Sequence, residues 1–361
     1  MIKEVLSTYG CSLNSIVIPF GNGLINDTWK VEDENSNYIL QKINIGIFKH
    51  PEYISENVHS IASYLLVHYP DYYFLTPVKT LDGKDLVFIK NDGYYRMFPF
   101  IKNSHTIDVA ESAHQTFEAA KKFGELTKLL ANFPAENLKI TLADFHNLSL
   151  RYKDFVQAKE FGIKERIEKS NELIKFLESQ KDVVEEFEKI KSSKNFKLRV
   201  THHDTKINNV LFNDEEKGIC VIDLDTLMPG YFISDVGDMI RTCVPCVNEE
   251  EKNISKIQIR EEIFVALAEG YLSEMYNELT EEELNHFVYA GKFMIYMQAL
   301  RFLSDYLNND VYYGSAYEGQ NFFRTANQTQ LLKLLIENEK KFSGIVSAIV
   351  QKKSHGLKHQ L

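Results

Sequence analysis

The sequence is poor in the features that mark several common classes of protein. Only 4 of its 361 residues are cysteine and 8 are proline, which argues against a disulfide-stabilised scaffold and a proline-rich chain. No apolar run approaches the ~20 residues of a membrane-spanning helix, and the first residues lack a charged and then apolar leader. We therefore expect a cytoplasmic protein that has no membrane partner.

An excess of positive charge is also missing. The formal net charge is −10 and no long basic run occurs, so nucleic acid is a poor candidate as a partner. Cys243 and Cys246 have the spacing of half a zinc site, but a second pair of ligands is lacking and we expect free thiols. The length of 361 residues favours two lobes over one compact core.

Residues 202–209 carry a motif with a clear chemical meaning. They read H-x-D-x-x-x-x-N and run directly into an apolar, strand-like stretch. In kinase-like phosphotransferases the Asp of this motif orients the attacking hydroxyl and accepts its proton, and the Asn holds Mg²⁺. Asp204 is therefore the predicted base and Asn209 a predicted metal ligand. His202 is expected to brace the loop through hydrogen bonds.

A second segment supplies the acid that such a site requires. Residues 219–222 are apolar and end at Asp223, which predicts a buried strand that holds a second Mg²⁺ ligand. Asp225 is either a further metal ligand or a residue behind the metal, and the sequence leaves both open. A plain hairpin with solvated acids is the alternative, but the motif and its strand context together favour the metal site.

Residues 1–100 are predicted to form a small, strand-rich lobe with one helix. Strands are expected near 16–20, 29–31, 38–43, 86–90 and 94–98, with a helix over 51–68 and a hinge over 98–101 that meets adenine. The turn at Gly21, Asn22 and Gly23 would let backbone amides approach the phosphates of ATP. Lys42 is expected to pair with the phosphates and Glu56 with Lys42. An exposed Lys42, and Asn57 in place of Glu56, are the alternatives.

Residues 101–361 are predicted to form a larger and mainly helical lobe. Apolar periodicity indicates helices over 113–132, 259–276, 281–308 and 325–350, and a helical pair within the charged segment 151–193. The tail from residue 352 is polar and is expected to be frayed. Asp235 and Asp238 are expected to brace the catalytic loop.

The chain resembles the group of aminoglycoside phosphotransferases and choline kinases, and within it the N-acetylhexosamine 1-kinases. The resemblance rests on residues 21–29, 38–44, 203–210, 222–230 and 301–307. It implies an α+β, two-lobed, protein-kinase-like fold, with ATP and Mg²⁺ at the lobe boundary and Thr28 near the nucleotide. It also implies transfer of the γ-phosphate to the C1 hydroxyl of N-acetylglucosamine or N-acetylgalactosamine.

The large lobe would then supply the sugar-binding residues. Arg301 and Asp305 share one face of a predicted helix, with Tyr306 and Tyr312 close by and Arg241 as a second candidate. Each of them could instead serve a structural contact. A kinase of another small alcohol (an aminoglycoside, choline, homoserine or a thiosugar) and a non-catalytic nucleotide-binding module are the alternatives. The epimer and the oligomeric state stay open, a monomer included.

Overall fold

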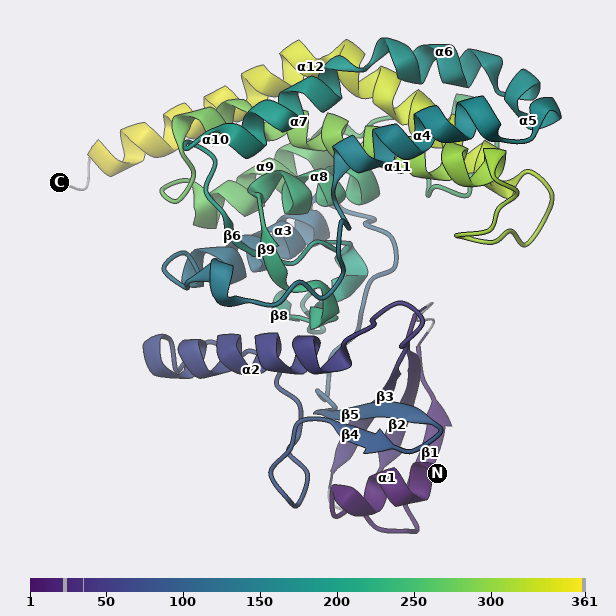
Figure 1. The fold of residues 1–361 in the computed structure, drawn as a ribbon. Helices are drawn as coiled ribbons and strands as arrows, with labels where there is room; N and C mark the ends of the chain where they lie inside the picture. The colour runs from purple at the N-terminus through teal and green to yellow at the C-terminus, as the bar shows by residue number, and fades with distance from the viewer. Residues whose placement is uncertain (22–24, 35, 359–361) are drawn as a thin grey trace.

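The computed structural model describes residues 1–21, 25–34 and 36–358 and divides into a small and a large lobe (Figure 1). The small lobe is an antiparallel five-stranded sheet in the order β1-β2-β3-β5-β4. The elements of residues 1–100, in chain order, are α1 (Ile2–Thr8), β1 (Ile16–Pro19), β2 (Asp27–Glu32), β3 (Asn37–Ile43), α2 (Pro51–His68), β4 (Val87–Ile89) and β5 (Gly93–Pro99). The predicted strands and the predicted helix over 51–68 are confirmed, whereas α1 was not foreseen.

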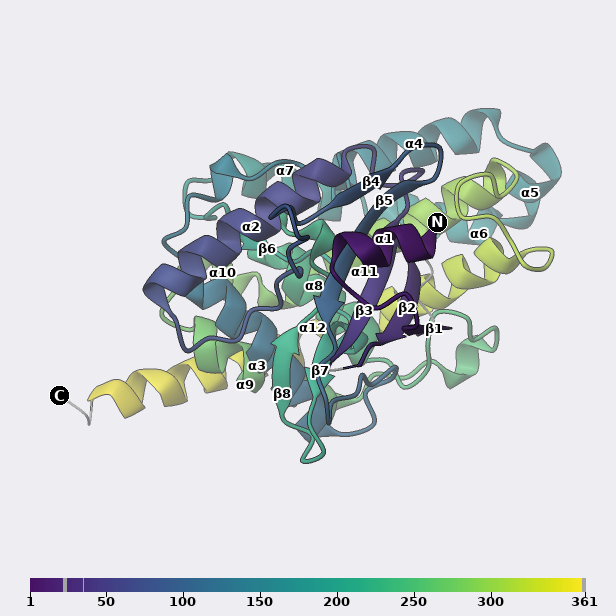
Figure 2. The ribbon, with the colours of Figure 1, turned by 90° about the horizontal axis from the view of Figure 1, so that it is seen from below.

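The two faces of this sheet have different partners. Alternate residues such as Leu40 and Met97 pack with Val5 of α1, and we call this the outer face. Figure 2 shows α1 lying across it. Ile43 instead joins the core of the large lobe, and we call its side the inner face. Since side chains alternate along a strand, the register decides which polar residues meet the large lobe.

Helix α2 belongs to the large lobe by its packing, although it lies early in the chain. Its apolar residues Ile54, Val58, Ile61 and Leu65 are buried in the large core. Figure 1 shows the helix between the sheet and the rest of the molecule. The repeat of apolar residues every three to four positions explains this single buried stripe.

The large lobe is mainly helical, with two short two-stranded ladders in the orders β6-β9 and β7-β8. Its helices are α3 (Ala113–Leu129), α4 (Leu148–Phe161), α5 (Lys164–Lys169), α6 (Asn171–Ser179), α7 (Asp182–Ser192), α8 (Phe232–Cys243), α9 (Glu261–Met275), α10 (Glu281–Asn285), α11 (Phe287–Leu307) and α12 (Gln320–Lys358). Its strands are β6 (Arg199–Thr201), β7 (Val210–Phe212), β8 (Gly218–Val221) and β9 (Met228–Gly230). The predicted α+β, two-lobed fold is confirmed.

Three details of the helical prediction were wrong. The segment 151–193 belongs to four helices rather than two, because short turns near Gly162, Ser170 and Gln180 interrupt the charged pattern. The segment 281–308 is divided at His286 into α10 and α11. The helix α12 continues to Lys358 instead of fraying from residue 352. Among the described residues, no helix combines the length and the apolar character needed to cross a membrane.

Candidate active site

The catalytic loop lies between β6 and β7 and is held by its own hydrogen bonds. The backbone N–H of Asp204 donates to Nδ1 of His202 at 3.3 Å, and Nε2 of His202 lies 3.0 Å from the carbonyl oxygen of Ile222. His202 thereby links the loop to the segment that carries Asp223. Burial lowers the pKa of His202, which fits a neutral ring that donates through Nε2.

Two acids of α8 also hold the catalytic loop in place through hydrogen bonds. The carboxylate of Asp235 accepts hydrogen bonds from the backbone N–H groups of His202 (3.0 Å) and His203 (2.7 Å). The carboxylate of Asp238 accepts one from the backbone N–H of Thr205 at 2.9 Å. The prediction that Asp235 and Asp238 brace the loop is confirmed.

Asp204 is partly buried and is paired with a residue that the sequence analysis did not consider. Lys206 places Nζ 3.0 Å from Oδ1 of Asp204. Although burial alone would raise the pKa of Asp204, Lys206 beside it holds this pKa below its ordinary value. Asp204 is therefore ionised at neutral pH and is able to accept a proton. Lys206 lies only two residues after Asp204 in the sequence, and this spacing could have predicted the ion pair.

Asn209 and Asp223 offer oxygen ligands at the same end of the β7–β8 ladder, Asn209 just before β7 and Asp223 just after β8. The Nδ2 of Asn209 donates to the carbonyl oxygen of Asp204 at 2.8 Å, which leaves its Oδ1 as the available acceptor. Asp223 has a left-handed φ of 56° and is exposed to solvent. Protein atoms around it, and the charges of Asp225 and Asp204, raise its pKa to about 7.

This donor set fits Mg²⁺, because a cation would relieve the repulsion among the acids. In the part of the chain that the structure describes, no three His, Cys, Asp or Glu side chains form a metal cluster. Mg²⁺ does not need one, since it keeps several waters and binds substrate phosphates. Asn209 and Asp223 would supply the protein ligands.

Asp225 contacts the small lobe instead of standing free beside Asp223. Its Oδ1 lies 2.5 Å from a guanidinium nitrogen of Arg96, and its Oδ2 accepts a hydrogen bond from Asn26 at 2.8 Å. Both partners come from the small lobe, and both escaped the sequence analysis. These contacts favour the alternative that Asp225 lies behind the metal, and its role as a direct metal ligand stays a prediction.

The predicted ion pair between Lys42 and Glu56 is wrong. Lys42 shares the outer face of β3 with Leu40 and pairs with Asp92 of the β4–β5 turn at 2.6 Å. Glu56 is exposed on α2, while its neighbour Asn57 is buried. The register of β3 is the reason, since it directs Gln41, not Lys42, toward the inner face.

The glycine turn is described only in part. Gly21 has a left-handed φ of 75°, as a tight turn requires. Asn22 and Gly23 lie outside the described residues. Thr28 on β2 lies opposite Gln41 of β3, whose side-chain amide donates to its hydroxyl at 3.4 Å. Thr28 therefore reaches the inner face, on the side where a nucleotide would bind.

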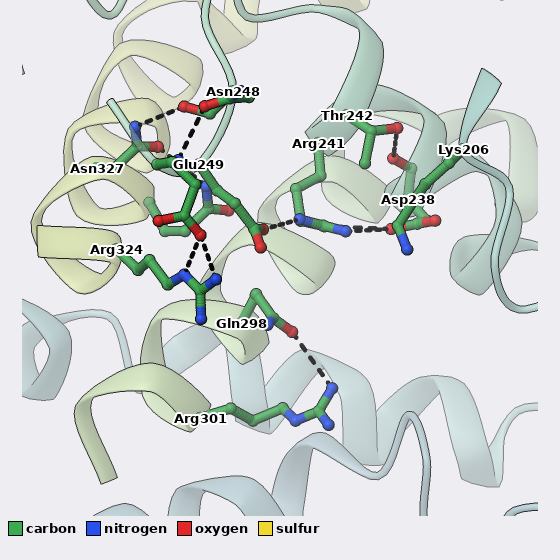
Figure 3. A network of polar contacts seen from close by, with 12 residues as sticks. Lys206, Asp238, Arg241, Thr242, Asn248, Glu249, Gln298, Arg301, Arg324 and Asn327 are labelled. Carbon is green, nitrogen blue, oxygen red and sulfur yellow. Dashed lines mark hydrogen bonds and ion pairs between the residues drawn. The ribbon is translucent and has the colours of Figure 1, made fainter. Parts of the chain in front are cut away.

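Of the predicted sugar-binding residues, Arg301 on α11 is the one with a free charge. Its guanidinium lies 5.4–5.8 Å from the ring centres of Phe145, Tyr312 and Tyr313. It donates to Oε1 of Gln298 at 3.2 Å, as Figure 3 shows. Among the described side chains, no carboxylate pairs with it. We call Arg301, Phe145, Gln298, Tyr312 and Tyr313 the Arg301 cluster.

The Arg301 cluster is connected to the catalytic loop through two histidines. His146 stacks on Phe145, and its Nδ1 lies 3.3 Å from Nδ1 of His203, the residue before Asp204. Burial and the nearby charges of His203 and Arg301 lower the pKa of His146 well below its usual value. His146 therefore stays neutral, and the positive field comes from the arginines.

Three of the other predicted sugar ligands, Asp305, Tyr306 and Arg241, make contacts within the protein. The carboxylate of Asp305 accepts hydrogen bonds from the backbone N–H groups of Tyr312 and Tyr313 and so fixes the loop after α11. Tyr306 is buried against Phe322. Arg241 is held between Asp238 at 2.9 Å and Glu249 at 2.8 Å (Figure 3). Tyr312 is exposed and borders Arg301, so of these residues it alone keeps a free surface.

Comparison with known proteins decides the family. Residues 16–272 match the family described as the phosphotransferase enzyme family. The chain belongs to this family of phosphotransferases. The match spans β1 to α9 and includes the catalytic loop and Asp223. The resemblance to aminoglycoside phosphotransferases and choline kinases is confirmed, whereas the closer likeness to N-acetylhexosamine 1-kinases stays a prediction.

Solved structures share the fold of this phosphotransferase. A microcompartment-associated aminopropanol kinase is 16% identical with a TM-score of 0.68, over 95% of this chain and 98% of that one. An amicoumacin kinase in complex with AMP-PNP and Ca²⁺ is 15% identical, with a TM-score of 0.63 over 92% of both chains. The choline kinase of Cryptosporidium parvum is 15% identical, with a TM-score of 0.57 over 95% and 96%.

Proposed function

We propose that this phosphotransferase is an ATP-dependent kinase of N-acetylhexosamines that forms the sugar 1-phosphate. The family supports a small-molecule kinase that acts on an alcohol. The identity of the acceptor and the roles of the individual site residues are part of the proposal. In the reaction, the oxygen of the C1 hydroxyl forms a bond to the γ-phosphorus, the bond to the bridging oxygen breaks, and ADP leaves.

The chain's own residues support this chemistry at the lobe boundary. Asp204 is ionised and held by its loop, so it can orient the C1 hydroxyl and take its proton as the new bond forms. Lys206 lies beside it and can offset negative charge on the transferred group. When bound by Asn209 and Asp223, Mg²⁺ would neutralise and orient the phosphate oxygens.

The observation that carries the choice of acceptor is the Arg301 cluster. A free guanidinium among three aromatic rings can donate to the carbonyl oxygen of an acetamide, while the rings pack against the sugar. The same guanidinium would repel an acceptor that carries a positive charge. The cluster thus supports a neutral acceptor over an amino alcohol.

A kinase of an amino alcohol is the second candidate. It is favoured by the likeness to the aminopropanol kinase and the choline kinase, which are named for such substrates. Against it stands the positive charge of Arg301, with which no described carboxylate forms an ion pair. The two candidates therefore predict opposite responses to the charge of the acceptor.

A panel of acceptors tests the proposal directly. ADP release would be measured with ATP and Mg²⁺ against N-acetylglucosamine, N-acetylgalactosamine, glucose, 1-amino-2-propanol, choline and kanamycin. We expect turnover on the N-acetylhexosamines, with a product phosphate that is stable to alkali and labile to acid. Turnover confined to the amines would keep the kinase and reject the sugar.

A further inference from the structure

On the inner face of the small sheet, as far as the structure describes its residues, the buried cation is Arg96. This residue lies on β5 directly opposite Gln41 of β3 and is only 4% exposed. Its neighbours Tyr95 and Met97 pack on the outer face with α1. Alternation along the strand therefore directs Arg96 toward the large lobe.

Two contacts fix the guanidinium of Arg96 at the lobe boundary. Its Nε donates to Oε1 of Gln41 at 3.0 Å, and Nη1 lies 2.5 Å from Oδ1 of Asp225. The second contact reaches a residue two positions after Asp223. Within residues 1–21, 25–34 and 36–358, Nη2 has no hydrogen-bond partner, so one edge of a planar donor group is left for a ligand.

The other cations of the sheet are less suited to a phosphate. Lys42 is on the outer face and pairs with Asp92. Lys30 reaches the inner face, but it pairs with Glu32 at 2.7 Å and lies over the ring of Phe100, beyond the end of β5. Of these three sheet cations, all within the described residues, Arg96 is the one that contacts Asp225, two positions after the predicted metal ligand Asp223.

We propose that Arg96, in place of the strand lysine expected from the motif, binds the α- and β-phosphates of ATP, and that Asp225 positions its guanidinium. An arginine suits this task because its fork of donors matches phosphate oxygens. Asn26, five residues after Gly21, donates to the other oxygen of Asp225 and so helps to hold this carboxylate in place. The inference rests on the nucleotide site of the proposed function, not on its acceptor.

The test compares binding of ATP and of adenosine, since adenosine lacks the phosphates. Calorimetry would be run with the full chain and Mg²⁺ on the wild type, Arg96→Gln and the control Lys42→Gln. We expect Arg96→Gln to weaken ATP binding by about tenfold or more and adenosine binding by less than about twofold, as loss of a charged hydrogen bond predicts. Lys42→Gln should leave both affinities unchanged.

Asp225→Asn separates phosphate binding from a purely structural role. If Arg96 only braced Asp225, this variant would lose ATP affinity as much as Arg96→Gln, and the inference would be overturned. We expect Asp225→Asn to weaken ATP binding by only a few-fold, clearly less than Arg96→Gln does, because it loosens the position of Arg96 but leaves its charge and its bond to Gln41 in place. Loss of ATP affinity in Lys42→Gln would also overturn it.

Two further controls keep the outcome clear. If Arg96→Gln does not fold, Arg96→Lys replaces it; a selective loss of ATP over adenosine supports the inference, and an equal loss of both rejects it. The binding measurement uses no acceptor. Absence of turnover on N-acetylhexosamines would therefore reject the sugar assignment without affecting the conclusion about Arg96.

Discussion

The side-chain amide of Asn57 on α2 donates a hydrogen bond of 2.9 Å to the carbonyl oxygen of Leu227, which directly precedes β9. The same side chain also donates to the carbonyl oxygen of Lys139 and accepts from its backbone N–H, each at 2.8 Å. Three hydrogen bonds thus tie α2 to the large lobe. The helix that the sequence analysis linked to Lys42 is instead a fixed part of the catalytic lobe.

Asn57→Asp is expected to destabilise the protein strongly. The change removes two donors and places a buried carboxylate opposite two carbonyl oxygens, which should lower the free energy of unfolding by about 3 kcal/mol. Urea unfolding would measure the loss. The neighbouring exposed residue gives a matched control, since Glu56→Gln should stay within about 0.5 kcal/mol of the wild type. Equal stability of both variants would contradict the anchoring role.

Asp204→Asn is expected to lower kcat by a factor of about 10²–10⁴, because the amide cannot accept the proton of the attacking hydroxyl. Stability should change little, since the backbone N–H and C=O of Asp204 keep their bonds to His202 and Asn209. Steady-state turnover and thermal unfolding would be compared with Asp214→Asn, a change at an exposed position. Full turnover in Asp204→Asn would rule out this base.

Asp235→Asn is expected to displace the catalytic loop. Asparagine offers one acceptor oxygen where two backbone N–H groups need one each, and its amide would face a donor. We expect a loss of about 2 kcal/mol in the free energy of unfolding. We also expect at least about a tenfold lower kcat with an unchanged KM for ATP, as a misplaced base implies. An unchanged kcat in a folded variant would contradict the bracing role.

Buried His203 makes a contribution to the free energy of unfolding that is lost as the pH falls below 6.5. Burial lowers the pKa of this histidine from 6.5 to about 4. The unfolded chain therefore binds the proton first, so this contribution is complete above pH 6.5 and is lost as the pH falls toward 4. Between pH 7 and pH 5 the loss is about 2 kcal/mol.

Urea unfolding at the two pH values would measure this dependence in the wild type and in His203→Asn. Asparagine is chosen because position 203 has a left-handed φ of 67°, which asparagine tolerates. The variant should lose about 2 kcal/mol less than the wild type between pH 7 and pH 5. An identical pH dependence would assign the effect to other groups.

Arg301→Met is expected to raise the KM for the acceptor by about 10- to 100-fold and to leave the KM for ATP unchanged. Under the proposed function, the change removes the charged donor that would bind the acceptor. Initial rates with both substrates varied would show it. Lys352→Met removes one positive charge at an exposed position of α12 and should change neither KM. A matching rise in the KM for ATP would contradict a role of Arg301 in binding the acceptor alone.

Local patterns in the sequence were enough to predict the fold class, the large elements and the catalytic loop. Apolar periodicity over 51–68 and the turn at Asn91-Asp92-Gly93 are local signals, and the structure follows them closely. The H-x-D-x-x-x-x-N pattern places Asp204 and Asn209 on one short loop, so their proximity needs no knowledge of the rest of the chain. Asp235 and Asp238 of α8 were also predicted to brace the catalytic loop, because they follow Asp223 closely in the sequence.

The pairing of polar residues across the two lobes depends on three-dimensional packing and could not be predicted from local patterns. A shift of one position in β3 or β5 exchanges the inner and outer faces, and the sequence could not choose between Gln41 and Lys42. Contacts such as Arg96 with Asp225 and Asn57 with Leu227 join residues more than a hundred positions apart. Their geometry depends on how α2 and the sheet pack on the large lobe, and no local pattern encodes that packing.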